Sequence, residues 1–396
     1  MMKPGNKILF ISNGYGEDTI ATSVIQELRK NISNDDIIAF PLVGEGKAYK
    51  NGNVSIVAPV KNMPSGGLIP GGWIKNLWKD FSSGLGRLMF EQIGALRKLK
   101  KNISMVVAVG DTFPVIIGGV FTGKPLLFIG TAKSDYFYPY SAAERKVFRK
   151  YCRMVFPRDE ITAESLRKAG ISAKWVGNAM MDNLGITDER FGIPEDVMVI
   201  TLLPGSRDFA YADFPILLDA AVFIDKSLEK KPAFIAPLAD AIELDELEKC
   251  AGRAGFELNR TGRSDGVVAK LNKKDIEIQL LRGRFGNTID MAKIVIGQAG
   301  TGNEQAVGLG KPVVSFDSAG SEKLGWYRLR QKGLLGDSLA ITRRDAQDVA
   351  IEALDILNNH EKYNKMAQIG IERLGPPGGA GRMAEAIYEM AKSINV

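Results

Sequence analysis

The sequence predicts an α/β protein of two Rossmann-like domains, and three observations support this prediction. Short apolar runs alternate with longer helical patterns through almost the whole chain, which is typical of successive βαβ units. The apolar runs are continuous rather than alternating, as expected for parallel strands covered on both faces. The length of 396 residues is about twice that of one ordinary domain. We therefore expect two parallel sheets in tandem, with a ligand-binding cleft between their carboxyl ends.

The first domain is expected over residues 1–181. Its first apolar run, residues 7–12, is too short for a signal peptide or a membrane span, and Gly14 ends it, so it predicts a buried strand. Further strands are expected at 36–43, 54–60, 105–110, 125–130, 153–157 and 174–177. The clearest helical patterns are those of 17–30, 141–151 and 161–169.

The second domain is expected over residues 197–377, after a stretch rich in Gly, Pro and Asp at 182–196 that we predict to be the interdomain linker. Its strands are expected at 197–203, 232–236, 266–270, 276–281, 293–297 and 312–316. The segment G-P-P-G-G-A-G at 375–381 breaks a helix. Residues 378–396 are expected to form a last helix that crosses back to the first domain.

The composition is that of an ordinary soluble globular protein, with 45% hydrophobic and 25% charged residues. The two cysteines, Cys152 and Cys250, stand alone, which fits a reducing compartment and excludes a disulfide framework. No stretch reaches 18 uninterrupted apolar residues. We therefore expect a cytoplasmic protein whose membrane contact, if any, is peripheral.

The net charge is +6 and the isoelectric point is near 9.0. Two helical stretches concentrate the basic residues, namely Arg97, Lys98, Lys100 and Lys101 in one, and Arg145, Lys146, Arg149, Lys150 and Arg153 in the other. Such charges attract anionic lipid head groups or phosphates, although a generally basic surface without a partner is an equally good interpretation. Nucleic acid is not expected, because no aromatic-interleaved basic platform accompanies these charges.

Residues 63–89 lead from a Gly/Pro-rich segment into an apolar helical pattern that contains Trp. Trp73 and Trp78 lie beside Lys75 and Lys79, which suits a membrane interface or a site for a lipid-like acceptor. A plain core helix is nearly as good an interpretation, because Trp, Leu and Phe at helical spacing usually face a core.

The single histidine, His360, lies between two helical stretches, where a histidine is usually a surface residue. Without a second histidine, no Ser/His/Asp triad, Cys/His pair or histidine-rich zinc site is available. Any general base is therefore expected to be Asp, Glu or Lys.

The turn S-N-G-Y-G-E-D-T at 12–19 follows a predicted strand and opens a helix. Gly14 and Gly16 allow a tight backbone turn, and the N–H groups at the start of the helix can bind an anion or sugar hydroxyls. Glu17 and Asp18 are expected at the same edge, although stabilisation of the helix dipole is an equally good role for them.

Asp111 ends an apolar strand. A carboxylate at the carboxyl end of a buried parallel strand is expected to face the cleft and to be partly desolvated, which raises its pKa towards that of a useful base. The alternative is that Asp111 or Thr112 caps the next helix, ahead of Pro114.

Two glycine loops follow strands of the second domain. In the first, L-L-P-G-S-R at 202–207, Gly205 and Ser206 free backbone donors, and the planar guanidinium of Arg207 can grip a diphosphate. The second loop opens the segment 297–312, which reads as strand, glycine loop, helix and turn. Its backbone N–H groups can bind phosphate and its first helical turn can bind ribose hydroxyls, through Gly300, Thr301, Gly302, Glu304 and Gln305. Two such loops at one edge predict nucleotide binding.

At these motifs the chain resembles the lipid-A-disaccharide synthases and their uncharacterised relatives, which are inverting glycosyltransferases of the GT-B fold. Residues 202–207 match the family's L-L-P-G-S-R, and 299–312 align with its S-G-T-x-x-x-E-x-x-x-x-G-x-P. Asp18 falls on the Asp of the family's G-E-A-S-G-D, and Asp111 falls on the first Asp of its D-x-P-x-F. Residues 379–387 resemble its final helix.

Three positions depart from the family pattern. The family's V-G-H-P is V-G-N-A at 176–179. Its Glu after the glycine loop aligns with Gln305, with Glu304 one place earlier, and Gly14 stands where the family has Glu. These departures bear on the acceptor and the sugar more than on the fold.

The resemblance implies an inverting, metal-independent hexosyltransferase that moves a sugar from a UDP-sugar to a lipid-like acceptor at an anionic membrane surface. It implies Asp111, or failing that Asp18, as the base, and Arg207 with residues 300–302 as the groups that stabilise the leaving diphosphate. No D-x-D motif is present to hold a metal, and no cofactor is expected. The expected location is the inner face of the membrane, and a homodimer is left open.

Two alternatives remain open on the sequence. One is a UDP-sugar 2-epimerase of the same fold, which needs no lipid acceptor and commonly relies on a catalytic histidine. The other is a non-catalytic protein that binds a nucleotide sugar or a lipid.

Overall fold

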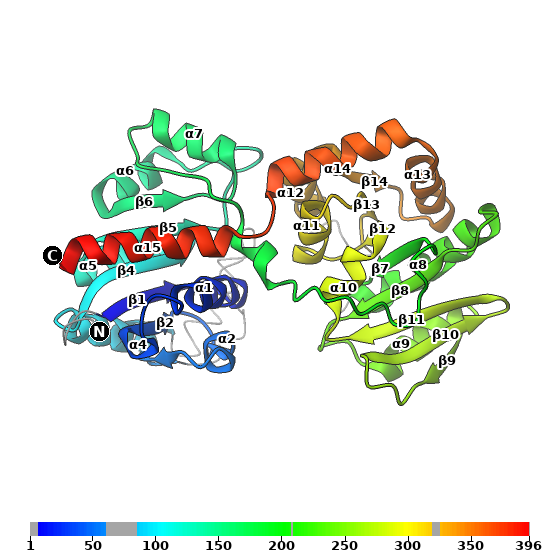
Figure 1. Ribbon diagram of the computed structural model, residues 1–396, viewed down its shortest axis with the longest axis horizontal. Coiled ribbons are helices and arrows are strands. Elements are labelled where there is room, and N and C mark those ends of the chain that lie inside the picture. The colour runs from blue at the N-terminus through cyan, green and yellow to red at the C-terminus, as the bar shows by residue number, and fades with distance from the viewer. Residues whose placement is uncertain (1–6, 61–84, 207–208, 319–324, 396) are drawn as a thin grey trace. The chain divides into compact units, whose positions relative to one another are not determined.

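The computed structural model describes residues 7–60, 85–206, 209–318 and 325–395. The chain divides into two compact units, of which unit 1 comprises Met1–Asn183 with Pro377–Val396 and unit 2 comprises Leu184–Pro376. Each unit holds its own sheet (Figure 1).

The sheet of unit 1 is parallel in all its described strands and has the order β3-β2-β1-β4-β5-β6. Its strands are β1 (Lys7–Ser12), β2 (Ile37–Pro41), β3 (Ser55–Ile56), β4 (Ile103–Gly110), β5 (Leu126–Gly130) and β6 (Cys152–Phe156). The chain first extends the sheet from β1 to β3 and then places β4 on the other side of β1. The carboxyl ends of β1 and β4 therefore mark the reversal point, where open α/β sheets bind their ligands.

Helices cover both faces of this sheet, which explains why its apolar runs do not alternate. Ile8 and Phe10 of β1 pack in the core cluster that includes α1 and α15, whereas Leu9 and Ile11 pack in the cluster of the opposite face, and all four are fully buried. The helices of unit 1 are α1 (Tyr15–Leu28), α2 (Lys47–Asn51), α4 (Leu85–Leu99), α5 (Thr112–Thr122), α6 (Ala142–Tyr151), α7 (Glu160–Lys168) and α15 (Gly379–Asn395).

The C-terminal helix α15, drawn in red in Figure 1, packs against α1 within unit 1. Asp182 holds its start, because one carboxylate oxygen accepts a hydrogen bond from the Gly378 N–H and the other accepts one from the Ala380 N–H at 2.6 Å. Arg382 donates a further bond to the carbonyl oxygen of Val176 at 2.7 Å. These bonds join two segments of unit 1 that are far apart in the sequence.

The predicted strand at 174–177 is wrong, because these residues have no strand structure. An isolated bridge between Val155 and Ala173 is the described pairing at this edge of the sheet. Val176 is instead buried in the core cluster that contains α1 and α15. The apolar run therefore reflects side-chain packing and not a further strand.

The sheet of unit 2 has the order β14-β13-β12-β7-β8-β11-β10-β9 in the described part of the chain. Its strands are β7 (Val199–Leu203), β8 (Ala233–Leu238), β9 (Glu257–Arg260), β10 (Val267–Lys273), β11 (Ile276–Arg282), β12 (Ala292–Gly297), β13 (Val313–Phe316) and β14 (Leu339–Thr342). The expected parallel pairing holds from β14 to β11. It is wrong for β10, which pairs antiparallel with both β11 and β9 at the edge.

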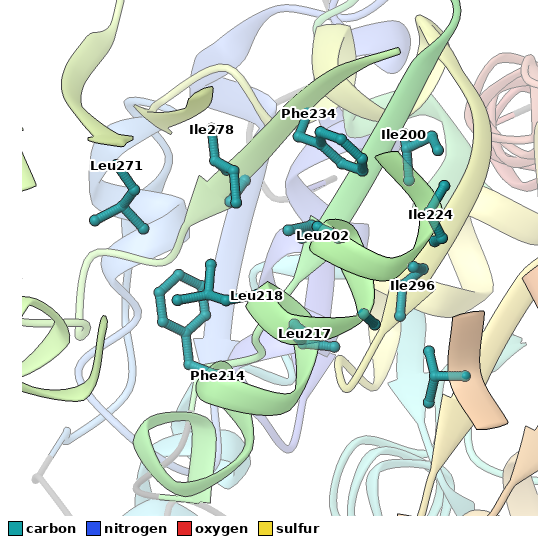
Figure 2. Close-up of a cluster of buried hydrophobic side chains, with 14 of the residues drawn as sticks. Ile200, Leu202, Phe214, Leu217, Leu218, Ile224, Phe234, Leu271, Ile278 and Ile296 are labelled. Atoms are coloured by element: carbon teal, nitrogen blue, oxygen red, sulfur yellow. The ribbon is translucent and has the colours of Figure 1, made fainter. Parts of the chain in front are cut away.

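The core of unit 2 lies where α8 covers the centre of the sheet. Figure 2 shows Ile200 and Leu202 of β7 near Phe214, Leu217 and Leu218 of α8, all of them fully buried. The helices of unit 2 are α8 (Phe209–Ser227), α9 (Leu244–Arg253), α10 (Phe285–Asp290), α11 (Thr301–Gly308), α12 (Gly325–Leu335), α13 (Ala346–Asn358) and α14 (His360–Leu374). None of the helices described in either unit combines the length and apolarity needed to cross a membrane.

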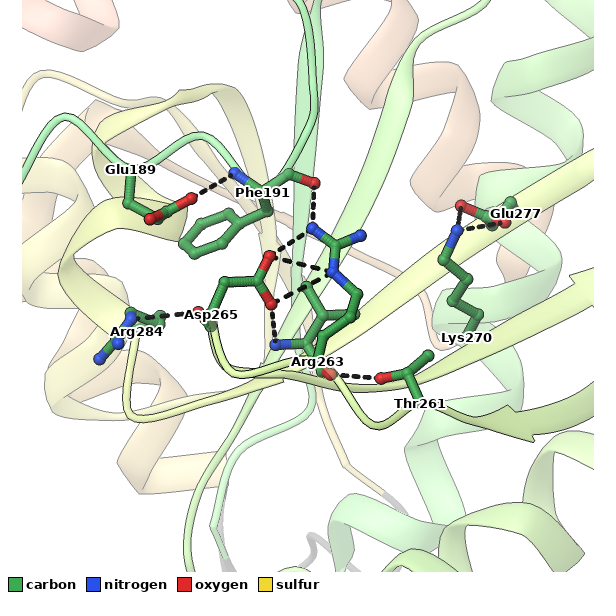
Figure 3. A network of polar contacts seen from close by, with 9 residues as sticks. Glu189, Phe191, Thr261, Arg263, Asp265, Lys270, Glu277 and Arg284 are labelled. Atoms are coloured by element: carbon green, nitrogen blue, oxygen red, sulfur yellow. Dashed lines mark hydrogen bonds and ion pairs between the residues drawn. The ribbon is translucent and has the colours of Figure 1, made fainter.

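Residues 184–196, which we expected within the interdomain linker, are packed as part of unit 2. Phe191 is fully buried, and its carbonyl oxygen accepts a hydrogen bond at 3.0 Å from Arg263, which also pairs with Asp265 (Figure 3). Asn287 donates hydrogen bonds to two carbonyl oxygens of the same segment, at 2.8 and 3.1 Å. The Gly, Pro and Asp residues of this segment therefore mark irregular but fixed structure.

Replacing Asp182 by Ala should destabilise unit 1, because two N–H groups at the start of α15 lose their acceptor. The expected loss is about 1–2 kcal/mol in the free energy of unfolding, as for a helix cap. Urea denaturation of the full chain measures it, with the exposed Asp188→Ala as the matched control. Equal unfolding curves for the two variants would show that Asp182 does not hold α15.

Candidate functional site

Asp111 lies at the reversal point of the unit 1 sheet, directly after β4. It caps α5, since its carboxylate accepts a hydrogen bond from the Phe113 N–H at 2.7 Å. The capping role that the sequence left open is thus real. Burial raises the pKa of Asp111 above its ordinary value, although bonds from Phe113 and the Asn13 side chain oppose this rise. A half-buried carboxyl of this kind holds a proton more tightly than a free aspartate, as a general base should.

A second ionisable cluster lies beside Asp111. Glu144 accepts hydrogen bonds from the Thr112 hydroxyl at 2.8 Å and from Lys133 at 2.7 Å. Burial raises the pKa of Glu144, but the bonds from Lys133, Ser141 and Thr112 outweigh it and keep the pKa below its usual value. Both charges act on Asp111, because Glu144 raises its pKa and Lys133 lowers it. This cluster was not predicted, although S-A-A-E at 141–144 is a recognisable capping box.

Asp18 lies inside the core rather than at the surface of the site. It is 1% exposed, it accepts a hydrogen bond from the Ser12 hydroxyl at 2.6 Å, and its other carboxylate oxygen is buried without a partner. The hydroxyl of the fully buried Tyr49 lies 2.6 Å from the same Ser12 oxygen. Burial, supported by the charge of Glu17, raises the pKa of Asp18 to about 7 despite the bond from Ser12. Asp18 is therefore largely protonated below neutral pH.

The other residues of the first turn differ in what they contribute. Glu17 accepts a hydrogen bond from the Thr131 hydroxyl at 3.2 Å and so links the loops after β1 and β5. A side chain at Gly14 would begin 2.3 Å from a Glu17 carboxylate oxygen, so only glycine fits there without a shift of Glu17. At Gly16 no atom lies within 4 Å of such a side chain.

The two predicted glycine loops are neighbours in unit 2, because β7 and β12 pair at its reversal point. The N–H of Gln298 donates a hydrogen bond to the carbonyl oxygen of Leu203 at 2.7 Å. Gly205 has a φ of +93°, and a side chain there would begin 3.4 Å from the carbonyl oxygen of Gln298. The positive φ therefore favours glycine here, whereas the loops leave room for ordinary contact at this position.

These loops line a pocket of about 360 Å³ in unit 2. Six of the eight predicted nucleotide-sugar residues line it, namely Gly205, Ser206, Gly300, Thr301, Gly302 and Gln305. The pocket also has an apolar side that was not predicted, formed by Leu203, Pro237, Leu238, Ala239, Phe285 and Tyr327. Its size and its mixed lining suit a nucleotide.

The remaining predicted residues are not part of this arrangement. Glu304 is half-buried on the same helical turn as Gln305 but is not among the described residues that line the pocket. His360 is exposed at the start of α14. Trp73, Trp78 and Arg207 lie outside the described residues. Within the described ranges, no group of three or more His, Cys, Asp or Glu residues could hold a metal ion.

The two Rossmann-like units, each with its loops at a sheet reversal point, give the chain the GT-B fold. Among curated proteins, the chain is similar to the lipid-A-disaccharide synthase of Synechocystis sp., with 25% identity over 265 residues, or 60% of this chain and 61% of the relative. The synthase of Syntrophus aciditrophicus is 23% identical over 249 residues, or 57% of this chain and 60% of the relative. The resemblance predicted from the motifs is thereby confirmed, and the match spans about three fifths of each relative.

Among solved structures, the putative UDP-N-acetylglucosamine 2-epimerase of Listeria monocytogenes is similar over 98% of this chain and 97% of its own. The TM-score is 0.60 and the sequence identity is 16%. This likeness confirms the two-domain fold. No protein-family model matches the chain.

The raised pKa of Asp18 predicts a pH-dependent loss of stability. Because the folded chain holds this proton up to about pH 7 whereas the unfolded chain releases it near pH 4, stability falls as pH rises between these values. We expect the wild type to lose on the order of 2–3 kcal/mol of unfolding free energy between pH 5 and pH 8 through this group. Asp18→Asn should lack this loss, as measured by urea denaturation across the range.

The matched control is Asp35→Asn, at an exposed aspartate of the same unit. It should keep the pH dependence of the wild type. Parallel curves for wild type and Asp18→Asn would mean that Asp18 is ionised throughout.

Proposed function

We propose that the chain is an inverting hexosyltransferase that moves a sugar from a UDP-sugar to a lipid-like acceptor. The observation that carries this proposal is the pocket of unit 2, in which two glycine loops and the start of α11 meet at the reversal point of the sheet. The similarity to lipid-A-disaccharide synthases supports transfer to a lipid-like acceptor.

The pocket suits a nucleoside diphosphate in each of its parts. The backbone of Gly300, Thr301 and Gly302 stands at the N-terminus of α11, where N–H groups and the helix dipole favour phosphate. Gln305 can donate to or accept from ribose hydroxyls, and Phe285 can cover a base. Arg207, directly after Ser206 in the sequence, supplies a planar cation for the diphosphate in this proposal.

Asp111 is the better of the two predicted bases. It is half-buried at the end of its strand, whereas Asp18 is 1% exposed and bonded to Ser12 inside the core. In the proposed reaction Asp111 takes the proton of the acceptor hydroxyl, and the hydroxyl oxygen bonds to the anomeric carbon. The bond from that carbon to the diphosphate oxygen breaks, so the configuration inverts. Phosphate-binding donors stabilise the charge on the departing diphosphate without a metal.

The acceptor and the location complete the proposal. Trp73, Trp78 and the two basic helical stretches suit a peripheral contact with an anionic membrane on the cytoplasmic side. All the basic residues of these stretches are exposed except Arg145, which is half-buried. A homodimer is compatible with the proposal.

A UDP-sugar 2-epimerase is the second candidate, because the solved structure with TM-score 0.60 bears that name. An epimerase needs no acceptor. Incubation with UDP-N-acetylglucosamine alone, followed by separation of the sugar products, would reveal an epimer. Release of UDP only when a lipid-like acceptor is present would support the transferase, and binding without any turnover would support a non-catalytic role.

Asp111→Asn should lower turnover roughly 10²- to 10⁴-fold, because the amide cannot accept the hydroxyl proton. UDP affinity should remain near that of the wild type, since the pocket lies in unit 2. In the wild type, the acidic limb of the rate profile should lie above the ordinary range of an aspartate, because burial raises the pKa of Asp111.

The matched control for this variant is Asp159→Asn. Asp159 follows β6 of the same sheet and caps α7 by accepting a hydrogen bond from the Thr162 N–H at 2.9 Å. The control reproduces the loss of a capping carboxylate and should keep turnover within a few-fold of the wild type. Retained turnover in Asp111→Asn would assign the base to another residue.

UDP should stabilise the protein equally with and without EDTA, because backbone and guanidinium donors replace a metal ion in this proposal. At 100 times its dissociation constant the expected gain is about 2.7 kcal/mol, measured by thermal or chemical denaturation. Gln305→Ala should weaken UDP binding more than Glu304→Ala, since only Gln305 of the two lines the pocket. A UDP effect that vanishes in EDTA would contradict metal independence.

A further inference from the structure

Arg328 is a buried cation whose described hydrogen-bond partners are neutral. It lies on α12, is 5% exposed, and donates hydrogen bonds to the side-chain oxygens of Gln331 at 2.5 Å and Gln298 at 2.6 Å. Burial lowers the pKa of Arg328, but a guanidinium keeps its charge at neutral pH. The folded chain therefore holds a permanent positive charge in a poorly solvated place, which is unfavourable without an anion.

The acidic groups around Arg328 do not neutralise it. Asp213 and Asp317 act on it electrostatically, but neither is within ion-pair distance among the described contacts. Asp213 pairs with Arg344 at 3.0 Å instead, and Asp317 is exposed.

Arg328 lines a small cavity beside the proposed nucleotide pocket. The cavity has a volume of about 40 Å³. It shares five lining residues with the larger pocket, namely Gly205, Ser206, Ala299, Gly300 and Tyr327. The cation thus lies next to both glycine loops and to Tyr327, which lines the pocket as well.

The partners of Arg328 fix the second loop. The side-chain N–H₂ of Gln331 donates hydrogen bonds to the carbonyl oxygens of Ala299 at 3.2 Å and Gly300 at 3.0 Å. Gln298 lines the cavity, and its side-chain nitrogen is buried without a partner. The carbonyl oxygens of Ala299 and Gly300 therefore already accept hydrogen bonds. Arg328 and Gln298, in contrast, add hydrogen-bond donors to the lining of the cavity. The exposed Asp317 also lines the cavity, but the buried donors and the permanent cation favour an anion there.

We propose that Arg328 binds one phosphate group of a diphosphate. This phosphate group would occupy the small cavity between the loops at 205–206 and 298–300. This inference rests on the proposed function, because the diphosphate would be that of the nucleotide sugar. Its planar fork can hold two phosphate oxygens at once and can stabilise the charge that the diphosphate gains when the sugar leaves. Lysine could offer only a point charge at the same place.

The test compares three ligands by isothermal titration calorimetry at constant ionic strength: inorganic pyrophosphate, UDP and uridine. Arg328→Gln in the full-length protein should weaken pyrophosphate and UDP roughly 10- to 100-fold, as for a lost charge-assisted hydrogen bond, and leave uridine unchanged. Arg328→Lys should weaken the same two ligands less. The matched control is Lys332→Gln, which removes a cation of the same helix that pairs with Asp337 at 3.2 Å, and should change none of them.

A purely structural Arg328 predicts a different pattern. In that case Arg328→Gln should lower the thermal midpoint of the ligand-free protein and leave the affinities of the folded fraction unchanged. In our proposal the affinities for pyrophosphate and UDP fall whatever happens to the midpoint, which two opposing effects decide: a buried charge is removed, but Gln298 and Gln331 lose a donor. Should Arg328→Gln fail to fold, Arg328→Lys keeps the charge and provides the same comparison of pyrophosphate with uridine.

The outcomes separate this inference from the proposed function. If pyrophosphate binds in an Arg328-dependent way but UDP does not bind, the anion site stands and the proposed function fails. If UDP binds equally to wild type and Arg328→Gln, the donor site stands and the role of Arg328 is refuted. Absence of pyrophosphate and UDP binding in the wild type would refute both.

Discussion

Burial of both faces of each sheet is the constraint on which the rest of the structure depends. Once helices cover the two faces, the ends of the strands are the places where a sheet can meet a ligand. In unit 1 the ends of β1 and β4 carry Asn13 and Asp111, and in unit 2 the ends of β7 and β12 carry the two glycine loops. The polar groups gather at these ends because the strands themselves are apolar and leave no room for them.

The same burial explains how much of the fold the sequence could predict. A strand such as β4, buried at all eight positions, is apolar apart from Ser104, and its continuous run from Met105 can be recognised in the sequence. β9 (E-L-N-R) lies at an exposed edge and has no apolar run, so it was not predicted. Residues 174–177 show the converse error, since Val176 is buried in the core cluster that contains α15 without belonging to a strand. The local pattern of apolar residues thus indicates which residues are buried. It identifies a strand only where the buried residues also pair with another strand.

The candidate site was predictable where glycine or a strand end marked it. Gly205 reveals its loop because its φ of +93° favours glycine, and Gly300 reveals the other because a side chain there would meet the Tyr327 hydroxyl. No sequence motif marks Lys133 or Arg328, because the contacts of each side chain are made with residues elsewhere in the chain. Lys133 reaches Glu144 across 11 positions, and Arg328 reaches Gln298 across 30. A single sequence does not display contacts of this kind.

Asp18 and Arg328 show how the same burial has opposite consequences for two ionisable groups. Each is at least nine-tenths buried, and neither has an ion-pair partner in the described part of the chain. Asp18 can remain neutral by keeping its proton, because its pKa is about 7. It can therefore stay in the core without a charge below neutral pH. Arg328 cannot lose its proton at neutral pH. Asp213 and Asp317 favour its charge from a distance but do not pair with it, so a bound anion would relieve more of the unfavourable energy of its burial. A phosphate in the adjacent cavity would supply that anion, which is why Arg328 points to a ligand while Asp18 points to the pH dependence of stability.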